Sequence, residues 1–207
     1  MIYQILALVI WSSTFIAAKY AEGMVDPAMT VQIRLVIAAL AVLPVCRRYI
    51  GRIPQDKWKP LLWLSFLNYV GVLMFQFIGV KYTSAASAAT MIGLEPLMMV
   101  FVGHFFFNDR ARPYHWLCGA AAFVGVAVLI LGGGEGGGIS IFGCMLVFMG
   151  GIVFCSITRP TQKLIGEIGA PAYTSVSLAV SAVLCLPFSL LLAERYTVVW
   201  NWQGAAA

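Results

Sequence analysis

Seven long apolar stretches divide the chain, with short polar segments between them. They cover about residues 2–21, 27–45, 61–80, 85–107, 114–131, 139–158 and 172–192. Each has roughly the 17 to 25 residues that an α-helix needs to cross a bilayer. The pattern therefore predicts an all-α polytopic membrane protein with the lipid bilayer as its surroundings.

The composition supports this interpretation. Hydrophobic residues make up 61% of the chain and charged residues 10%, whereas soluble domains have about 45 to 50% apolar and about 25% charged residues. A soluble core of this size would leave too few polar residues to cover it. The first stretch lacks the basic start of a signal peptide and is followed by further full-length stretches, so we interpret it as a span.

The positions of the basic residues indicate how the chain lies in the membrane. Nine of them fall after the second, fourth and sixth stretches: Arg47, Arg48, Arg52, Lys57, Lys59, Arg110, Arg112, Arg159 and Lys163. The opposite side has three: Lys19, Lys81 and Arg195. Because basic residues are enriched in cytoplasmic loops, the N-terminus and these three loops are predicted to be cytoplasmic. The net charge of +5 thus reflects the orientation of the chain in the membrane, and we expect no nucleic-acid partner.

Other residue types give no sign of catalysis or of a bound cofactor. The five cysteines lie in or at the ends of apolar stretches without C-x-x-C spacing, which is typical of packing residues. His104 and His115 have no acidic or cysteine partner at ligand spacing. "GGGEGGG" (residues 132–138) is followed by no G-K-[ST] and resembles a flexible linker. We therefore expect no cofactor, no metal and no enzymatic activity.

An internal repeat becomes visible when the chain is shifted against itself. A shift of 143 residues aligns Ala39 with Ala182, Leu43 with Leu186, Pro44 with Pro187 and Ser13 with Ser156. We expect residues 1–131 to form a first five-helix repeat, 132–138 a Gly-rich periplasmic linker, and 139–207 an incomplete second repeat of two helices. Because five spans are an odd number, the second copy must enter the membrane inverted, as in many secondary transporters.

Several short motifs resemble those of a known family. They are "WSSTF" (residues 11–15), Arg34 with Ala38 one turn later, "KYTSA" (81–85), Pro96, and the Asp109-Arg110 end of the fourth stretch. In order and spacing they resemble the EamA-type drug/metabolite transporters over essentially the whole chain. The resemblance implies a ten-helix exporter of the bacterial inner membrane, with two inverted repeats, cytoplasmic termini, and amino acids or related small metabolites as substrates.

The length of the chain departs from this family pattern. The repeat spacing predicts three more helices after the seventh stretch, yet the sequence ends at "NWQGAAA", where the eighth would begin. We therefore expect about seven transmembrane helices of ten and a C-terminal truncation. That expectation puts transport by this chain alone in question.

Two ionisable residues lie deep within the apolar stretches, Arg34 and Glu95. Arg34 is about seven and Glu95 about eleven residues from the outer ends of their spans, a difference in depth of about 6 Å at about 1.5 Å per residue. A charge at the bilayer centre costs roughly 2.5 to 3.5 kcal/mol and needs a cavity or a partner. The two side chains are therefore predicted to be each other's partners.

The helix that carries Glu95 supplies the other main candidates. Pro96 removes a backbone hydrogen bond and Gly93 loosens the same turn, so we expect a helix break there. Ser87, Met91, Glu95 and Met99 recur at intervals of four and form one predicted face of the helix. We take this stripe as the wall of a translocation cavity. Trp11, Ser13 and Gln76 are further candidates for lining that cavity.

The preferred function is secondary active transport of a small-molecule substrate by alternating access. The alternative is a channel-like or non-transporting membrane fragment in which Arg34 and Glu95 form a structural ion pair. Proton coupling and a homodimer are both compatible with the sequence.

The basic asymmetry predicts the orientation directly. A reporter fused after Arg52 should behave as cytoplasmic, and one inserted after Glu135 as periplasmic, because nine basic residues lie on the first side and three on the second. Paired alkaline phosphatase and fluorescent-protein fusions measure this. Exchanged signals would contradict the orientation and the inverted repeat together.

Overall fold

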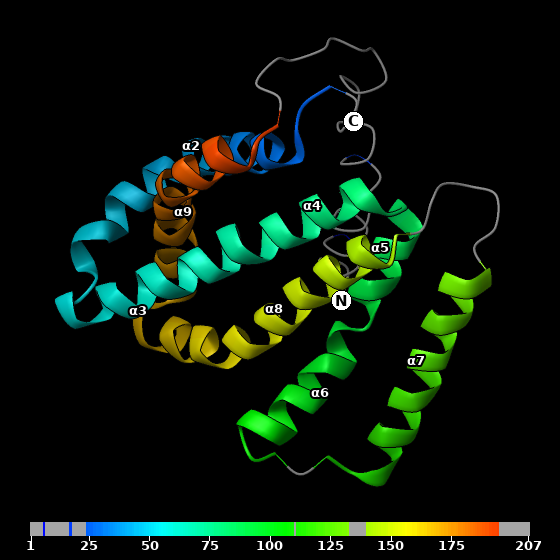
Figure 1. Cartoon of the computed structure of the whole chain (residues 1–207). Coiled ribbons are helices and arrows are strands. Elements are labelled where there is room, and N and C mark those ends of the chain that lie inside the picture. The colour runs from blue at the N-terminus through cyan, green and yellow to red at the C-terminus, as the bar shows by residue number, and fades with distance from the viewer. Residues whose placement is uncertain (1–5, 7–16, 18–23, 110, 133–139, 195–207) are drawn as a thin grey trace.

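The computed structural model describes residues 24–109, 111–132 and 140–194, together with residues 6 and 17. Within these residues the regular elements are helices and no strand occurs, which confirms the all-α prediction for this part of the chain (Figure 1). The elements are α2 (Pro27–Tyr49), η1 (Ile50–Arg52), α3 (Gln55–Ser65), η2 (Phe66–Val72), α4 (Leu73–Tyr82), α5 (Ala85–Gly93), α6 (Glu95–Phe106), α7 (Pro113–Gly132), α8 (Ile141–Ile168) and α9 (Ala170–Leu192).

Four helical segments are long and apolar enough to cross a membrane: Pro27–Arg52, Gln55–Tyr82, Ile141–Ile168 and Ala170–Leu192. A fifth candidate consists of α5 and α6, which meet at an angle of 41°. The apolar part of α7, Pro113–Val128, is shorter. The stretch expected at residues 2–21 lies mostly outside the described residues.

Local sequence signals explain where the helices begin. The Asp26 carboxylate accepts a hydrogen bond from the Ala28 amide at 3.0 Å, and Pro27 follows in the first turn of α2. Ser84 caps α5 in the same way, accepting from the Ser87 amide at 3.1 Å. Gly169, with φ of 88°, separates α8 from α9. Glycine adopts this conformation without the strain that a Cβ would cause, so the chain can reverse there.

Ion pairs show which helix ends lie on the same side of the bundle. Lys57 at the start of α3 pairs with Glu167 at the end of α8, with Nζ and Oε2 2.7 Å apart. Arg159 of α8 pairs with Asp109, which follows α6. On the opposite side, Lys81 at the end of α4 pairs with Glu194 after α9, again at 2.7 Å. The long helices therefore run from one side to the other, as successive membrane crossings would.

Helices α2 and α9 form the most extensive helix pair of the described part, and they lie side by side in Figure 1. The Glu194 amide, beyond the end of α9, donates to the Asp26 carboxylate at the start of α2. Deeper in the interface, Gln32 Nε2 donates to the Ala182 carbonyl at 2.9 Å. These contacts make the pair antiparallel.

Glycines bring α8 into close contact with α4. A Cβ added to Gly143 would lie 2.8 Å from the carbonyl oxygen of Gly79, and one added to Gly79 would lie 2.6 Å from a methyl group of Val147. In membranes, small residues allow helix backbones to approach closely, and packing then stabilises the pair. The position of α8 beside α4 therefore depends on the absence of side chains at Gly79 and Gly143.

This contact predicts a stability difference between two substitutions in α8. Gly143→Ala should destabilise the protein by about 1 to 3 kcal/mol, because the methyl group meets backbone atoms that cannot rotate away. Gly166→Ala is the matched control in the same helix, since nothing lies within 4 Å of the added Cβ. Thermal unfolding in detergent should show a lower midpoint for the first variant only, and equal midpoints would show that the Gly79 contact does not determine the packing.

Candidate functional site

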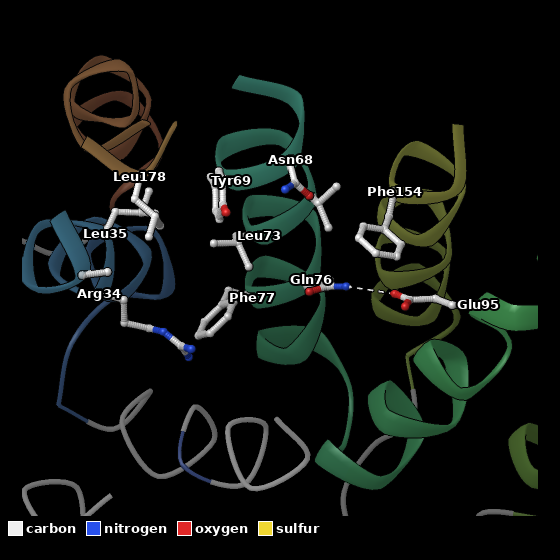
Figure 2. A pocket seen from close by; sticks show the side chains of 12 residues that line it. Arg34, Leu35, Asn68, Tyr69, Leu73, Gln76, Phe77, Glu95, Phe154 and Leu178 are labelled. Carbon is white, nitrogen blue, oxygen red and sulfur yellow. Dashed lines mark hydrogen bonds between the residues drawn. The ribbon is translucent and has the colours of Figure 1, made fainter. Parts of the chain in front are cut away.

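A cavity of about 440 Å³ lies between the helices. Figure 2 shows its side chains converging from α2, from the continuous η2–α4 segment, and from α6, α8 and α9. It is lined by Arg34, Leu35, Ala38, Asn68, Tyr69, Val72, Leu73, Gln76, Phe77, Glu95, Phe154 and Leu178. Most of this wall is apolar, and the two ionisable residues predicted deep in the membrane both belong to it.

Glu95 is the first residue of α6 and is half-buried. Gln76 of α4 donates from Nε2 to Glu95 Oε1 at 3.4 Å (Figure 2). The Cys155 thiol of α8 donates to the Glu95 carbonyl oxygen at 3.4 Å. Gly151 allows this approach, because a Cβ there would lie 2.9 Å from Met98 Sδ and 3.7 Å from Glu95 Cγ. Helices α4 and α8 together therefore position the carboxylate.

Arg34 reaches the cavity from α2 and remains exposed at its edge. Its guanidinium carbon lies 4.9 Å from the centre of the Phe77 ring. A cation over an aromatic face is stabilised by about 0.5 to 2 kcal/mol, depending on its exposure. Phe77 thus stabilises the charge, and among the described residues the Arg34 guanidinium makes no ion pair.

The predicted direct pair between Arg34 and Glu95 is wrong. No ion pair within 4.0 Å joins them among the described residues. Their partners, Phe77 and Gln76, are consecutive residues of α4 and point about 100° apart around the helix axis. The two charges therefore face one cavity from different sides, with α4 between them.

Of the predicted stripe, Glu95 alone lines this cavity. Ser87 is buried at the start of α5, where its hydroxyl accepts from Ser84 Oγ at 2.9 Å. Met91 is buried in an apolar cluster, and Met99 is 38% exposed. Because the helix axis bends by 41° between Gly93 and Glu95, the four-residue spacing does not continue as one face.

The other sequence candidates are distributed as follows. Gln76 lines the cavity, as Asn68 does. Gly93 ends α5, and Pro96 lies in the first turn of α6, so the break falls at Leu94 between them. Trp11 and Ser13 lie outside the described residues.

Three aromatic residues of the wall, Tyr69, Phe77 and Phe154, did not emerge from the sequence. A signal for two of them exists, because Tyr69 and Phe77 lie eight residues apart and share a helix face with Leu73. Tyr69 and Asn68 belong to η2, a π-helical segment. Such wide turns are frequent at functional sites because they change the direction of side chains.

Comparison with known proteins identifies the family. The model of the EamA-like transporter family matches residues 1–131 of the 207. The chain belongs to the EamA-like transporter family. This confirms the resemblance in the sequence motifs and makes the protein a membrane transporter by family.

Individual relatives of this EamA-like chain differ in how much they share with it. A Haemophilus influenzae protein is 56% identical over 114 residues, which are 55% of this chain and 89% of the relative. A Chlamydia muridarum protein named as an S-adenosylmethionine/S-adenosylhomocysteine transporter is 22% identical over 93% of this chain and 62% of its own length. A solved crystal structure shares the fold, with a TM-score of 0.63 and 20% identity over 97% of this chain and 69% of that one.

The separation of the two charges predicts how their substitutions combine. Arg34→Gln and Glu95→Gln should change the free energy of unfolding additively, within about 0.5 kcal/mol, because the side chains do not touch. Gln76→Leu and Glu95→Gln should show a coupling of at least about 0.5 kcal/mol, because these two are in contact. Double-mutant cycles of unfolding in detergent measure both coupling energies. If Glu95→Gln restored the stability lost in Arg34→Gln, that result would establish the direct pair instead.

Proposed function

We propose that this EamA-like protein is a secondary transporter that exports a small metabolite with an amino-acid end group across the bacterial inner membrane. The observation that carries the proposal is the cavity of about 440 Å³ with a guanidinium at one side and a carboxylate at the other. An amino-acid group has the complementary charges, an ammonium and a carboxylate. Such a ligand would offer its ammonium to Glu95 or its carboxylate to Arg34, one contact at a time, because α4 lies between the two side chains.

The geometry assigns a role to each side chain. Glu95 would attract the ammonium group of the bound ligand, and Arg34, on the other side of α4, would attract the carboxylate as the ligand enters or leaves. Tyr69, Phe77 and Phe154 would contact the rest of the molecule, since ligand sites combine apolar walls with a few directed polar groups. The charged groups would then orient the ligand, and the apolar walls would limit its size.

The named relative supports the same substrate class. S-adenosylmethionine and S-adenosylhomocysteine both carry an amino-acid end, joined to an adenosine. The proposal for this chain is limited to that shared end group, because the chain covers only 62% of the length of the Chlamydia muridarum protein.

Alternating access through inverted repeats is part of the proposal. Helices α2 and α9, which the 143-residue shift relates, each have 23 residues. Each has a proline in its first turn, Pro27 and Pro171, and a second near its end, Pro44 and Pro187. Their antiparallel packing is the relation that an inverted repeat requires. The cavity lies beside this pair, where a substrate site between repeats is expected.

Binding to the full chain in lipid nanodiscs tests the role of Glu95. S-adenosylmethionine should raise the unfolding temperature, and adenosine, which lacks the amino-acid end, should not. Glu95→Gln keeps the shape and removes the charge, so it should weaken S-adenosylmethionine binding at least about tenfold, or about 1.4 kcal/mol.

The control is Asp56→Asn, which removes an exposed carboxylate at the start of α3. It should leave binding unchanged. Equal stabilisation by adenosine, or unaltered binding by Glu95→Gln, would refute the proposed recognition. Efflux from vesicles that contain the full chain then measures transport separately from binding.

A further inference from the structure

A second cavity, of about 530 Å³, lies between α6, α7 and α8 and shares no lining residue with the charged cavity. Its lining consists of apolar and aromatic residues. Met98 and Val102 form the floor and are 5% and 7% exposed, whereas Phe105, Trp116 and Phe123 are 69%, 42% and 45% exposed. The cavity is therefore a groove that opens on the surface of the bundle, along α7 at its edge (Figure 1).

Aromatic contacts fix the end of the groove beside the α6–α7 loop. The Trp116 ring centroid lies 4.9 Å from that of Phe101 and 5.6 Å from that of His104. His104 Nδ1 accepts a hydrogen bond from the Ala111 amide at 3.2 Å. The loop is thus held against the end of α6, and with it the next residue, Arg112.

Arg112 places a positive charge at this end. It is exposed and lies one helical turn before Trp116 in the sequence. Among the described residues no ion pair involves Arg112, whereas the nearby carboxylate of Asp109 is already paired with Arg159. An apolar groove with an uncompensated cation at one end matches an amphiphile with an apolar tail and an anionic head.

The surroundings of a membrane transporter supply such a molecule. An empty groove would lose the dispersion contacts of its lining, and water in it would find no polar partners. Along α7, Phe123 lies eleven residues beyond Arg112, or about 16 Å at about 1.5 Å per residue. This is about half of the roughly 30 Å of bilayer hydrocarbon, the depth that one lipid chain fills. Trp116 then lies near the headgroup level, where tryptophan is enriched.

We propose that the groove between α6, α7 and α8 binds one acyl chain of an anionic phospholipid, with the headgroup phosphate at Arg112. Basic pockets between membrane helices recognise anionic headgroups in this way. The bound lipid fills the space between α7 and the rest of the bundle. It requires no transport substrate and is therefore independent of the proposed function.

A substitution that fills the groove tests the site of the acyl chain. The full chain in detergent is mixed with dioleoyl phosphatidylglycerol, and native mass spectrometry counts the lipid bound. Ala120 lines the groove and is exposed, so Ala120→Phe should weaken phosphatidylglycerol binding at least about tenfold. Ala121→Phe is the matched control, because this exposed neighbour on the same helix does not line the groove and should keep the lipid.

A charge substitution tests the headgroup contact. Arg112→Gln should weaken phosphatidylglycerol binding about fivefold, the effect of one basic residue near the membrane surface, and leave dioleoyl phosphatidylcholine binding unchanged. Arg48→Gln, which removes an exposed arginine from the last turn of α2, is its control and should change neither.

Thermal unfolding in detergent verifies that each variant is folded, and Ala120→Leu replaces Ala120→Phe if the latter is not. Equal lipid loss at positions 120 and 121, or equal binding of the two phospholipids by the unsubstituted chain, would overturn the proposal. So would the loss of a dimer mass in Ala120→Phe with the lipid retained, because a second copy would then cover the groove. None of these outcomes depends on whether S-adenosylmethionine binds.

Discussion

The separation of Arg34 from Glu95 by helix α4 is the constraint on which the cavity depends. Phe77 holds the guanidinium on one side of α4, and Gln76 holds the carboxylate on another. A direct ion pair would satisfy both charges and close the space between them. A ligand would then have to break that pair before it could bind, and its affinity would fall by the cost of doing so. The weaker contacts with Phe77 and Gln76 stabilise each charge without that cost.

Close packing of α8 makes this arrangement possible. Gly143 lies against Gly79 of α4, and Gly151 lies against Glu95 and Met98 of α6. Through these contacts one helix positions two others, and it adds Phe154 to the cavity wall. The residues that shape the site thus include glycines that do not line it.

Apolar stretches and charges were sufficient to predict much of the fold. The long helices α2, α8 and α9 fall within or extend the predicted stretches, and Arg34, Glu95 and Gln76 all line one cavity. Depth in the membrane can be counted along a helix, which is why these residues were predicted at similar levels. The direction of a side chain around its helix depends on packing, and the sequence contains no measure of it.

The predicted Arg34–Glu95 pair and the predicted stripe both depend on that direction. Arg34 and Glu95 were predicted at similar depths, yet they contact different residues of α4, Phe77 and Gln76. Ser87 and Met91 keep the spacing of Glu95 but do not line the cavity, and the helix bends by 41° between them and Glu95. A proline signals that a helix bends, whereas the size and direction of the bend are set by the neighbouring helices. The η2 segment likewise has no signature in its sequence, although it carries Asn68 and Tyr69.

The packing of the helices bears on how such a cavity could change its accessibility. Two closely packed pairs contribute to its wall: α2 with α9, joined by hydrogen bonds of Gln32, and α4 with α8, joined at their glycines. Contacts between the pairs include the Ser181–Ser65 hydrogen bond and the hydroxyls of Tyr69 and Ser177. Exchange of a hydroxyl contact with water costs little compared with separation of close-packed glycines. Movement of one pair against the other would therefore exchange the hydroxyl contacts of Ser177 and Ser181 before it separated the glycines.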